Sequence, residues 1–127
     1  MLIQKFTDLE VWKEAHKFTL LIYKFTKKFP KDEIFGLIPQ IRRAVVSIES
    51  NISEGFSRYH FKDRLNFYYQ SRGSASEVQT QLIIAKDLNY VNQNEFREAW
   101  ELSQKVLIIL SGLIKSTEAL SKNKKIT

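Results

Sequence analysis

The chain has 127 residues, 43% of them hydrophobic, which predicts a single domain with one core. It contains no cysteine, and its longest apolar run, VLIILSGLI, is interrupted by Ser111 and Gly112, so disulfides, cysteine nucleophiles and a membrane span are excluded. The net charge of +6 favours polyanionic partners, although a modest excess also serves solubility. The first residues lack the features of a secretion signal, so we expect a cytoplasmic protein.

The first of four stretches with helical periodicity begins near the amino terminus. Thr7 or Asp8 can cap this helix, and it should end at Phe29, because the following proline disfavours helical geometry in the residue before it. Residues 31–38 form the longest connection. Pro39 suits the first position of the second helix.

The second and third helices carry glycines with two interpretations each. The second helix runs to about Ser57, and Gly55 either ends it or allows close packing. The third helix runs from about residue 61 to 89. Gly73 in its interior indicates a close backbone crossing or a bend.

The fourth helix begins with a capping box formed by Asn92 and Glu95. We expect residues 1–121 to form the bundle and residues 122–127 to form a basic, flexible tail. Because the second, third and fourth helices are joined by short loops, they should be antiparallel neighbours. The sequence therefore predicts an all-α, antiparallel up-and-down four-helix bundle.

A polar stripe follows the second helix beside its apolar face. Serine and asparagine are poor helix formers, so their presence in a helix interior indicates pairing with a neighbour rather than simple exposure. The third helix offers a matching polar row. We therefore predict polar pairing between helices or between subunits for Arg43, Ser47, Asn51, Glu54, Glu77 and Gln81.

Basic residues gather around the turn between the second and third helices, interleaved with aromatic residues. Guanidinium groups bind phosphate through two hydrogen bonds and aromatic rings stack on bases, so this pattern is typical of nucleic-acid contact. The candidates are Arg42, Arg58, Lys62, Arg64 and Arg72. The alternative is internal pairing of Arg43 and Arg58 with Glu54 or Glu77.

Another basic patch lies near the end of the first helix and consists of Lys24, Lys27, Lys28 and Lys31. A favourable interaction with the helix dipole is a sufficient explanation for it.

Catalytic and metal-binding patterns are missing from the sequence. The Glu-x-x-His motif of di-iron bundles does not occur, and the two histidines, His16 and His60, are not part of a ligand cluster. Arg58 and His60 lie two residues apart, so they face different ways and cannot share a phosphate as some helical ribonucleases require. Ser47 has no visible base. We therefore predict no catalytic residue, metal or cofactor.

Three ordered blocks carry a family resemblance: FPKDEIFGL, QIRRAVVSIESNISEG and RGSASEVQTQL. They resemble the four-helix-bundle family encoded in intervening sequences of bacterial 23S rRNA genes. A relative of that family is the accessory variability determinant protein of diversity-generating retroelements, a basic ring that works with a reverse transcriptase and RNA. The resemblance implies a four-helix bundle that assembles as a homo-oligomer, a pentameric ring.

Two functional hypotheses follow. The first is a non-enzymatic homo-oligomer that offers a basic surface to RNA, DNA or a ribonucleoprotein. The second is a protein–protein adaptor without a role in nucleic-acid binding, whose positive charge serves solubility or an acidic partner. Binding to random RNA or DNA that weakens steeply with salt would distinguish them.

Overall fold

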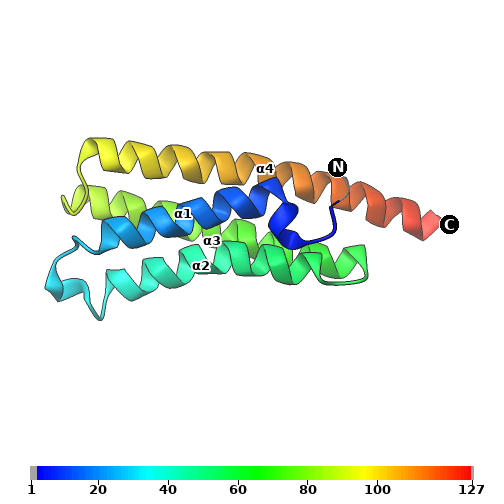
Figure 1. The fold of residues 1–127 in the computed structure, drawn as a ribbon, viewed down its shortest axis with the longest axis horizontal. Coiled ribbons are helices and arrows are strands. Elements are labelled where there is room, and N and C mark those ends of the chain that lie inside the picture. The colour runs from blue at the N-terminus through cyan, green and yellow to red at the C-terminus, as the bar shows by residue number, and fades with distance from the viewer. Residues whose placement is uncertain (1–2, 127) are drawn as a thin grey trace.

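The computed structural model describes residues 3–126, with side chains described to residue 123, and contains four long helices and two short 3-10 turns (Figure 1). No strand occurs in these residues. The predicted all-α four-helix bundle is confirmed. The elements in chain order are η1 (Phe6–Asp8), α1 (Glu10–Thr26), η2 (Lys31–Glu33), α2 (Leu37–Phe56), α3 (Phe61–Asp87) and α4 (Gln93–Ile126).

Consecutive helices run in opposite directions (Figure 1). The hydroxyl of Ser71 on α3 donates to the carbonyl of Ile48 on α2 at 2.8 Å, and the amide of Gln79 donates to the hydroxyl of Ser103 on α4 at 2.9 Å. Lys105 on α4 returns to α1 through an ion pair with Glu14 at 3.0 Å. Each helix thus packs against two neighbours.

The core is built from one apolar face of every helix. Each large aliphatic side chain that is fully buried contributes about 1.5–3 kcal/mol to stability relative to an exposed one. The largest fully buried side chains of the core include Phe18, Ile22, Ile41, Ile48, Ile52, Tyr68, Leu82 and Leu110.

Both ends of α1 differ from the prediction. The helix ends at Thr26, three residues before Phe29, because Phe29 turns inward, where it is buried and its ring lies 5.3 Å from that of Tyr90. At the other end the cap position is Leu9. Asp8 instead accepts hydrogen bonds from the backbone of Gln4 and Lys5, and so stabilises η1 rather than α1.

The remaining helix ends lie within a few residues of the predicted ones. α2 begins at Leu37, so Pro39 is its third residue, still in the first turn where no backbone donor is needed. α3 ends at Asp87, before Asn89, which adopts a left-handed backbone with φ of 62°. The predicted capping box is present, because Asn92 and Glu95 exchange hydrogen bonds of 2.8 and 2.9 Å.

α4 is much longer than its neighbours. Its 34 residues span about 51 Å at the helical rise, against about 26 Å for the 17 residues of α1. Its last turns project beyond the bundle in Figure 1. The segment predicted as a tail, residues 122–127, continues the helix through Ile126, and Thr127 lies outside the described residues. The flexibility of this segment stays a prediction.

The two glycines of α2 and α3 have opposite environments. Gly55 is buried, and a Cβ atom there would lie 2.7 Å from the ring of Tyr68, so this glycine permits close packing against α3. Gly73 is exposed, and nothing lies within 4 Å of a Cβ built on it. The interpretation of Gly73 as a close crossing within the chain is therefore wrong.

Gly55→Ala should lower the free energy of unfolding by about 1–3 kcal/mol, because the added methyl group overpacks a buried contact with Tyr68. Urea denaturation followed by circular dichroism measures the change. Gly112→Ala is the matched control. This exposed glycine of α4 has nothing within 4 Å of an added Cβ, so the substitution should raise stability by up to about 1 kcal/mol. Equal effects of the two substitutions would contradict the packing role of Gly55.

Candidate nucleic-acid interface

The predicted basic residues are spread along α2 and the first half of α3. Arg58, Lys62 and Arg64 surround the turn from α2 to α3, and Arg72 follows on α3. Arg42 lies near the start of α2, about 24 Å from Arg58 at the helical rise. Arg72 lies further along α3, next to Ser71, whose hydroxyl bonds to Ile48 in the middle of α2. The structure therefore brings three of the five candidates together at the turn and separates Arg42 and Arg72 from them.

Three guanidinium groups, two at the turn and one further along α3, lie over aromatic rings. The Cζ atom of Arg58 is 4.7 Å from the ring centroid of Phe67, and that of Arg72 is 5.2 Å from Tyr69. Arg64 lies between two rings, 5.2 Å from Phe56 and 5.4 Å from Phe61. We call Arg58, Lys62, Arg64 and Arg72 with these rings the arginine surface.

Few carboxylates neutralise the arginine surface. Arg58 forms an exposed ion pair with Glu54 at 2.7 Å, and the Nε of Arg64 donates to the carbonyl of Arg58 at 2.8 Å. Within the described residues, Lys62, Arg64 and Arg72 form no ion pair. These side chains can therefore accept an anionic partner without first breaking a salt bridge.

Glu118 of α4 lies beside this surface. It accepts a hydrogen bond from the hydroxyl of Tyr69 at 2.7 Å, and this bond raises the pKa of Tyr69. The bond ties the ring beneath Arg72 to α4.

The polar stripe of α2 meets α3 at a chain of hydroxyl and amide groups. The hydroxyls of Ser47 and Ser74 lie 2.9 Å apart across the two helices. The amide of Asn51 donates to the hydroxyl and the carbonyl of Ser47, each at 2.9 Å. Ser47 is thereby held between two partners, with no base in contact that could activate it as a nucleophile.

The other stripe residues do not bridge α2 and α3. Glu54 pairs along α2 with Arg58, and Glu77 accepts a bond along α3 from the amide nitrogen of Gln81 at 3.3 Å. Arg43 is exposed and makes no hydrogen bond or ion pair within the described part of the chain. The Oε1 atom of Gln81 is buried without a partner among these residues, which is costly in free energy.

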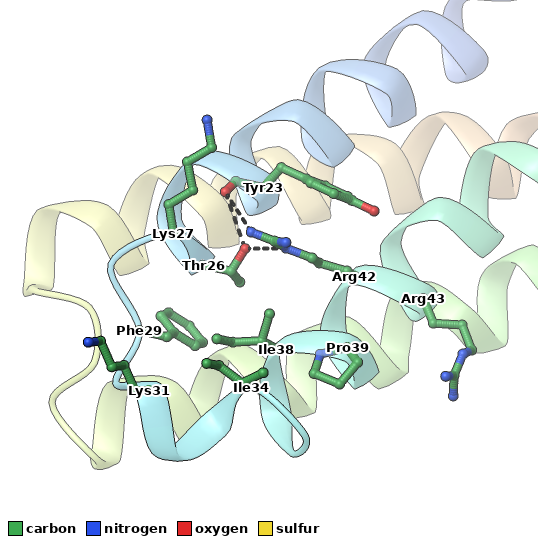
Figure 2. A pocket seen from close by; sticks show the side chains of 10 residues that line it. All are labelled: Tyr23, Thr26, Lys27, Phe29, Lys31, Ile34, Ile38, Pro39, Arg42 and Arg43. Atoms are coloured by element: carbon green, nitrogen blue, oxygen red, sulfur yellow. Dashed lines mark hydrogen bonds between the residues drawn. The ribbon is translucent and has the colours of Figure 1, made fainter.

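A pocket of about 650 Å³ lies between the end of α1, η2 and the start of α2 (Figure 2). Arg42 lies across it, with its Cζ 4.5 Å from the ring centroid of Tyr23. Its Nε donates to the hydroxyl of Thr26 at 2.8 Å, and its Nη2 donates to the carbonyl of Tyr23 at 3.4 Å. These bonds also satisfy the carboxyl end of α1, whose partial negative charge favours a cation.

Glu33, beside this pocket, accepts hydrogen bonds that stabilise the start of α2. One carboxylate oxygen accepts the backbone N–H of Leu37 at 2.9 Å, and the other accepts the hydroxyl of Tyr90 at 2.7 Å. These bonds lower the pKa of Glu33, with the backbone donor as the larger cause, and raise the pKa of Tyr90. Both of its oxygens are engaged by these two donors, and in the described part of the chain Glu33 forms no ion pair with a cation of the pocket.

The histidines and the acidic residues do not form a metal centre within residues 3–126, where no group of three or more potential ligands occurs. His16 stacks on Trp12 and lies 3.1 Å from a carboxylate oxygen of Glu49, and His60 is exposed at the start of α3. In the same residues no helix is both long and apolar enough to cross a membrane.

Comparison with known proteins identifies the family of this chain and a solved structure with a similar fold. The model of the family described as 23S rRNA-intervening sequence protein matches residues 7–112. The chain belongs to this family. Its fold is similar to that of a solved protein of unknown function from the S23 ribosomal protein family of Bacteroides thetaiotaomicron, with a TM-score of 0.75 and 23% identity over 83% of this chain and 98% of that one. No curated protein matches the chain.

The part of the chain that matches the 23S rRNA-intervening sequence family contains the arginine surface and the pocket around Arg42 in full. It ends within α4, before the projecting turns. Both candidate regions therefore belong to the shared part of the fold.

Several residues that shape these regions escaped the sequence analysis. Thr26 and Tyr23 hold Arg42, yet in the sequence they are only members of a helical row. Ser71 is completely buried and bonds to α2, but it was indistinguishable from its exposed serine neighbours. For the pocket, the available signal was the basic patch at the end of α1 together with the Arg42–Arg43 pair.

Glu33→Gln should make the bundle less sensitive to acid. The pKa of Glu33 is lowered on folding, so its carboxylate stabilises the native state above the ordinary glutamate value of about 4.3, and this contribution is lost as the pH falls through the lowered pKa. The difference in melting temperature between wild type and variant should be largest at pH 7 and shrink towards pH 3.

Glu98→Gln is the control for this pH series. Glu98 is exposed and makes no hydrogen bond or ion pair in the described part of the chain. Its effect on the melting temperature should stay nearly constant with pH. A difference for Glu33→Gln that grows towards low pH would contradict the assigned role of Glu33.

Proposed function

We propose that the chain is a non-catalytic subunit of a homo-oligomer that binds nucleic acid, alone or in a ribonucleoprotein, through the arginine surface. The observation that carries the proposal is the stacking of Arg58, Arg64 and Arg72 on aromatic rings, with an ion pair to a carboxylate at Arg58 only among the described residues. The net charge of +6 adds a long-range attraction for polyanions.

A stacked guanidinium suits phosphate binding. The ring covers one face of the group and limits its motion, while the N–H donors at its edge stay in plane and open to two phosphate oxygens. Arg64, with rings at 5.2 and 5.4 Å, is the most restricted of the three. Less conformational entropy is then lost when a phosphate binds.

The outer face of α3 supports assembly with further copies. Gly73, Glu77, Ile84 and Leu88 follow one another there at helical spacing, and Ile84 and Leu88 are 42% and 50% exposed. A second subunit on this face would bury the two apolar side chains. The pentameric ring implied by the sequence resemblance would repeat the arginine surface five times and strengthen its field.

The alternative is a protein–protein adaptor without nucleic-acid binding. The same exposed apolar face of α3 would then serve a different protein, and the positive charge would serve solubility or an acidic partner.

Wild-type protein should bind a fluorescein-labelled random 20-nucleotide RNA at low salt, with an affinity that falls steeply as NaCl rises. Arg64→Gln/Arg72→Gln should weaken binding and reduce the slope of log affinity against log salt by about 1.4, since each lost contact to single-stranded phosphate removes about 0.7. Fluorescence anisotropy measures both quantities.

Lys86→Gln/Arg97→Gln is the matched control for charge. Both residues are exposed and lie beside the α3–α4 turn, at the other end of α3 from the α2–α3 turn. This double variant should change the salt slope much less. Wild-type protein that binds neither RNA nor DNA at low salt would reject the proposal and favour the adaptor.

Light scattering should give a mass that is a multiple of the 15.0 kDa of one chain, five times that value for a pentamer. Ile84→Glu/Leu88→Glu should reduce the mass to one chain, because charges placed on the outer face of α3 cannot be buried between subunits. Ile108→Glu, on α4, changes a side chain that is 73% exposed and should leave the mass unchanged. If the wild-type protein has the mass of one chain, the proposed homo-oligomer is wrong.

A further inference from the structure

The pocket between α1 and α2 concentrates positive charge without a neutralising carboxylate. Lys27, Lys31, Arg42 and Arg43 line it, and no acidic residue does. Of these four, none forms an ion pair within the described residues. Only Arg42 lies across the pocket in Figure 2, and the charged ends of Lys27, Lys31 and Arg43 point outward from its rim. An anion in the pocket is attracted by all four positive charges.

Arg42 is the fixed element of this group. Its Nε and Nη2 atoms bond to Thr26 and Tyr23, and the buried Thr26 hydroxyl is itself anchored to the carbonyl of Ile22 at 2.8 Å. Nη1 has no partner among the described residues, so the edge formed by Nη1 and Nη2 still offers donors. The Nε–Nη2 edge of the guanidinium thus serves to cap α1, while the Nη1–Nη2 edge is held in a fixed orientation as a fork that can bind two oxygens of a ligand.

The floor of the pocket is apolar. Phe29, Ile34, Ile38 and Pro39 form it, below Arg42 in Figure 2, and Ile34 is 52% exposed although it is a large aliphatic residue. An inorganic anion would use the cations and leave this floor in water. The volume of about 650 Å³ lies in the range of sites for small organic ligands, which commonly combine an apolar wall with a few charged groups.

We propose that this pocket binds a nucleotide that carries a terminal phosphate, either as a free mononucleotide or at the 5′ end of an oligonucleotide. A phosphate monoester carries a charge of about −1.5 to −2 near pH 7, so a group of four cations attracts it more strongly than it attracts a carboxylate. The Arg42 fork takes two phosphate oxygens, and the flexible side chains of Lys27 and Lys31 close on the group. The nucleoside covers the apolar floor.

This site is independent of the arginine surface. Arg42 lies about 24 Å from Arg58 along α2, at the helical rise, and a mononucleotide cannot reach both. The proposal thus does not rest on the proposed function, and either can fail while the other holds.

Isothermal titration calorimetry of the full chain tests the site with adenosine and uridine 5′-monophosphates, with inorganic phosphate, and with one hexanucleotide bearing either a 5′-phosphate or a 5′-hydroxyl. We expect a 5′-phosphorylated probe to bind at least about tenfold more tightly than inorganic phosphate and than the 5′-hydroxyl hexanucleotide. Binding of the free mononucleotides identifies a small-molecule site. Binding of the phosphorylated hexanucleotide alone identifies a site for the end of a strand.

Variants separate the pocket from other cations. Arg42→Lys keeps the charge but loses the fork, and Lys27→Gln/Lys31→Gln leaves the Arg42 bonds to α1 intact. Each should weaken binding about tenfold. Lys13→Gln/Lys115→Gln, at two exposed lysines of α1 and α4 that do not line the pocket, should leave binding of the mononucleotides unchanged. The proposal would be overturned if no phosphorylated probe binds, if inorganic phosphate binds as tightly as the nucleotides, or if both pocket variants bind the nucleotides as tightly as wild-type protein does.

Discussion

Close contact between α2 and α3 sets the positions of everything else in this bundle. Small side chains make the contact possible. Gly55 leaves room for the ring of Tyr68, and the hydroxyl of Ser71 reaches a backbone carbonyl of α2 at 2.8 Å. Since these two contacts fix the register of the helices, they determine which side chains surround the turn between α2 and α3. The pocket at the other end of α2 is lined by α1, the connection through η2 and α2 alone.

Periodicity predicted the parts of the fold that depend on local sequence. Four helices, the capping box of α4 and the polar face of α2 were all visible, because each depends on spacing within one segment. The end of α1 was not, since it depends on contact between Phe29 and Tyr90, which are far apart in the chain. Gly73 shows the same limit: whether a helix glycine faces a neighbour or solvent is decided by packing.

The sequence predicted which residue types form the candidate sites, but not which of these residues lie together in the fold. Clustering of Arg58, Lys62 and Arg64 follows from their closeness in sequence around one turn. Arg42 is also an arginine, but it lies at the other end of α2 from the turn. There it lines the pocket together with Lys27 and Lys31, two lysines whose presence the sequence analysis attributed to the dipole of the first helix. The connection between α1 and α2 brings the apolar floor, Phe29, Ile34, Ile38 and Pro39, beneath these cations, and no local pattern encodes that arrangement.

The length of α4 has a practical consequence for work with this protein. Thr117 is the last buried residue among the side chains described, and the helix continues to Ile126. A fluorescent protein or an affinity tag joined after these turns would be carried on a helical spacer of about 13 Å beyond the packed core, at the helical rise. Such fusions should report on the native bundle without crowding it.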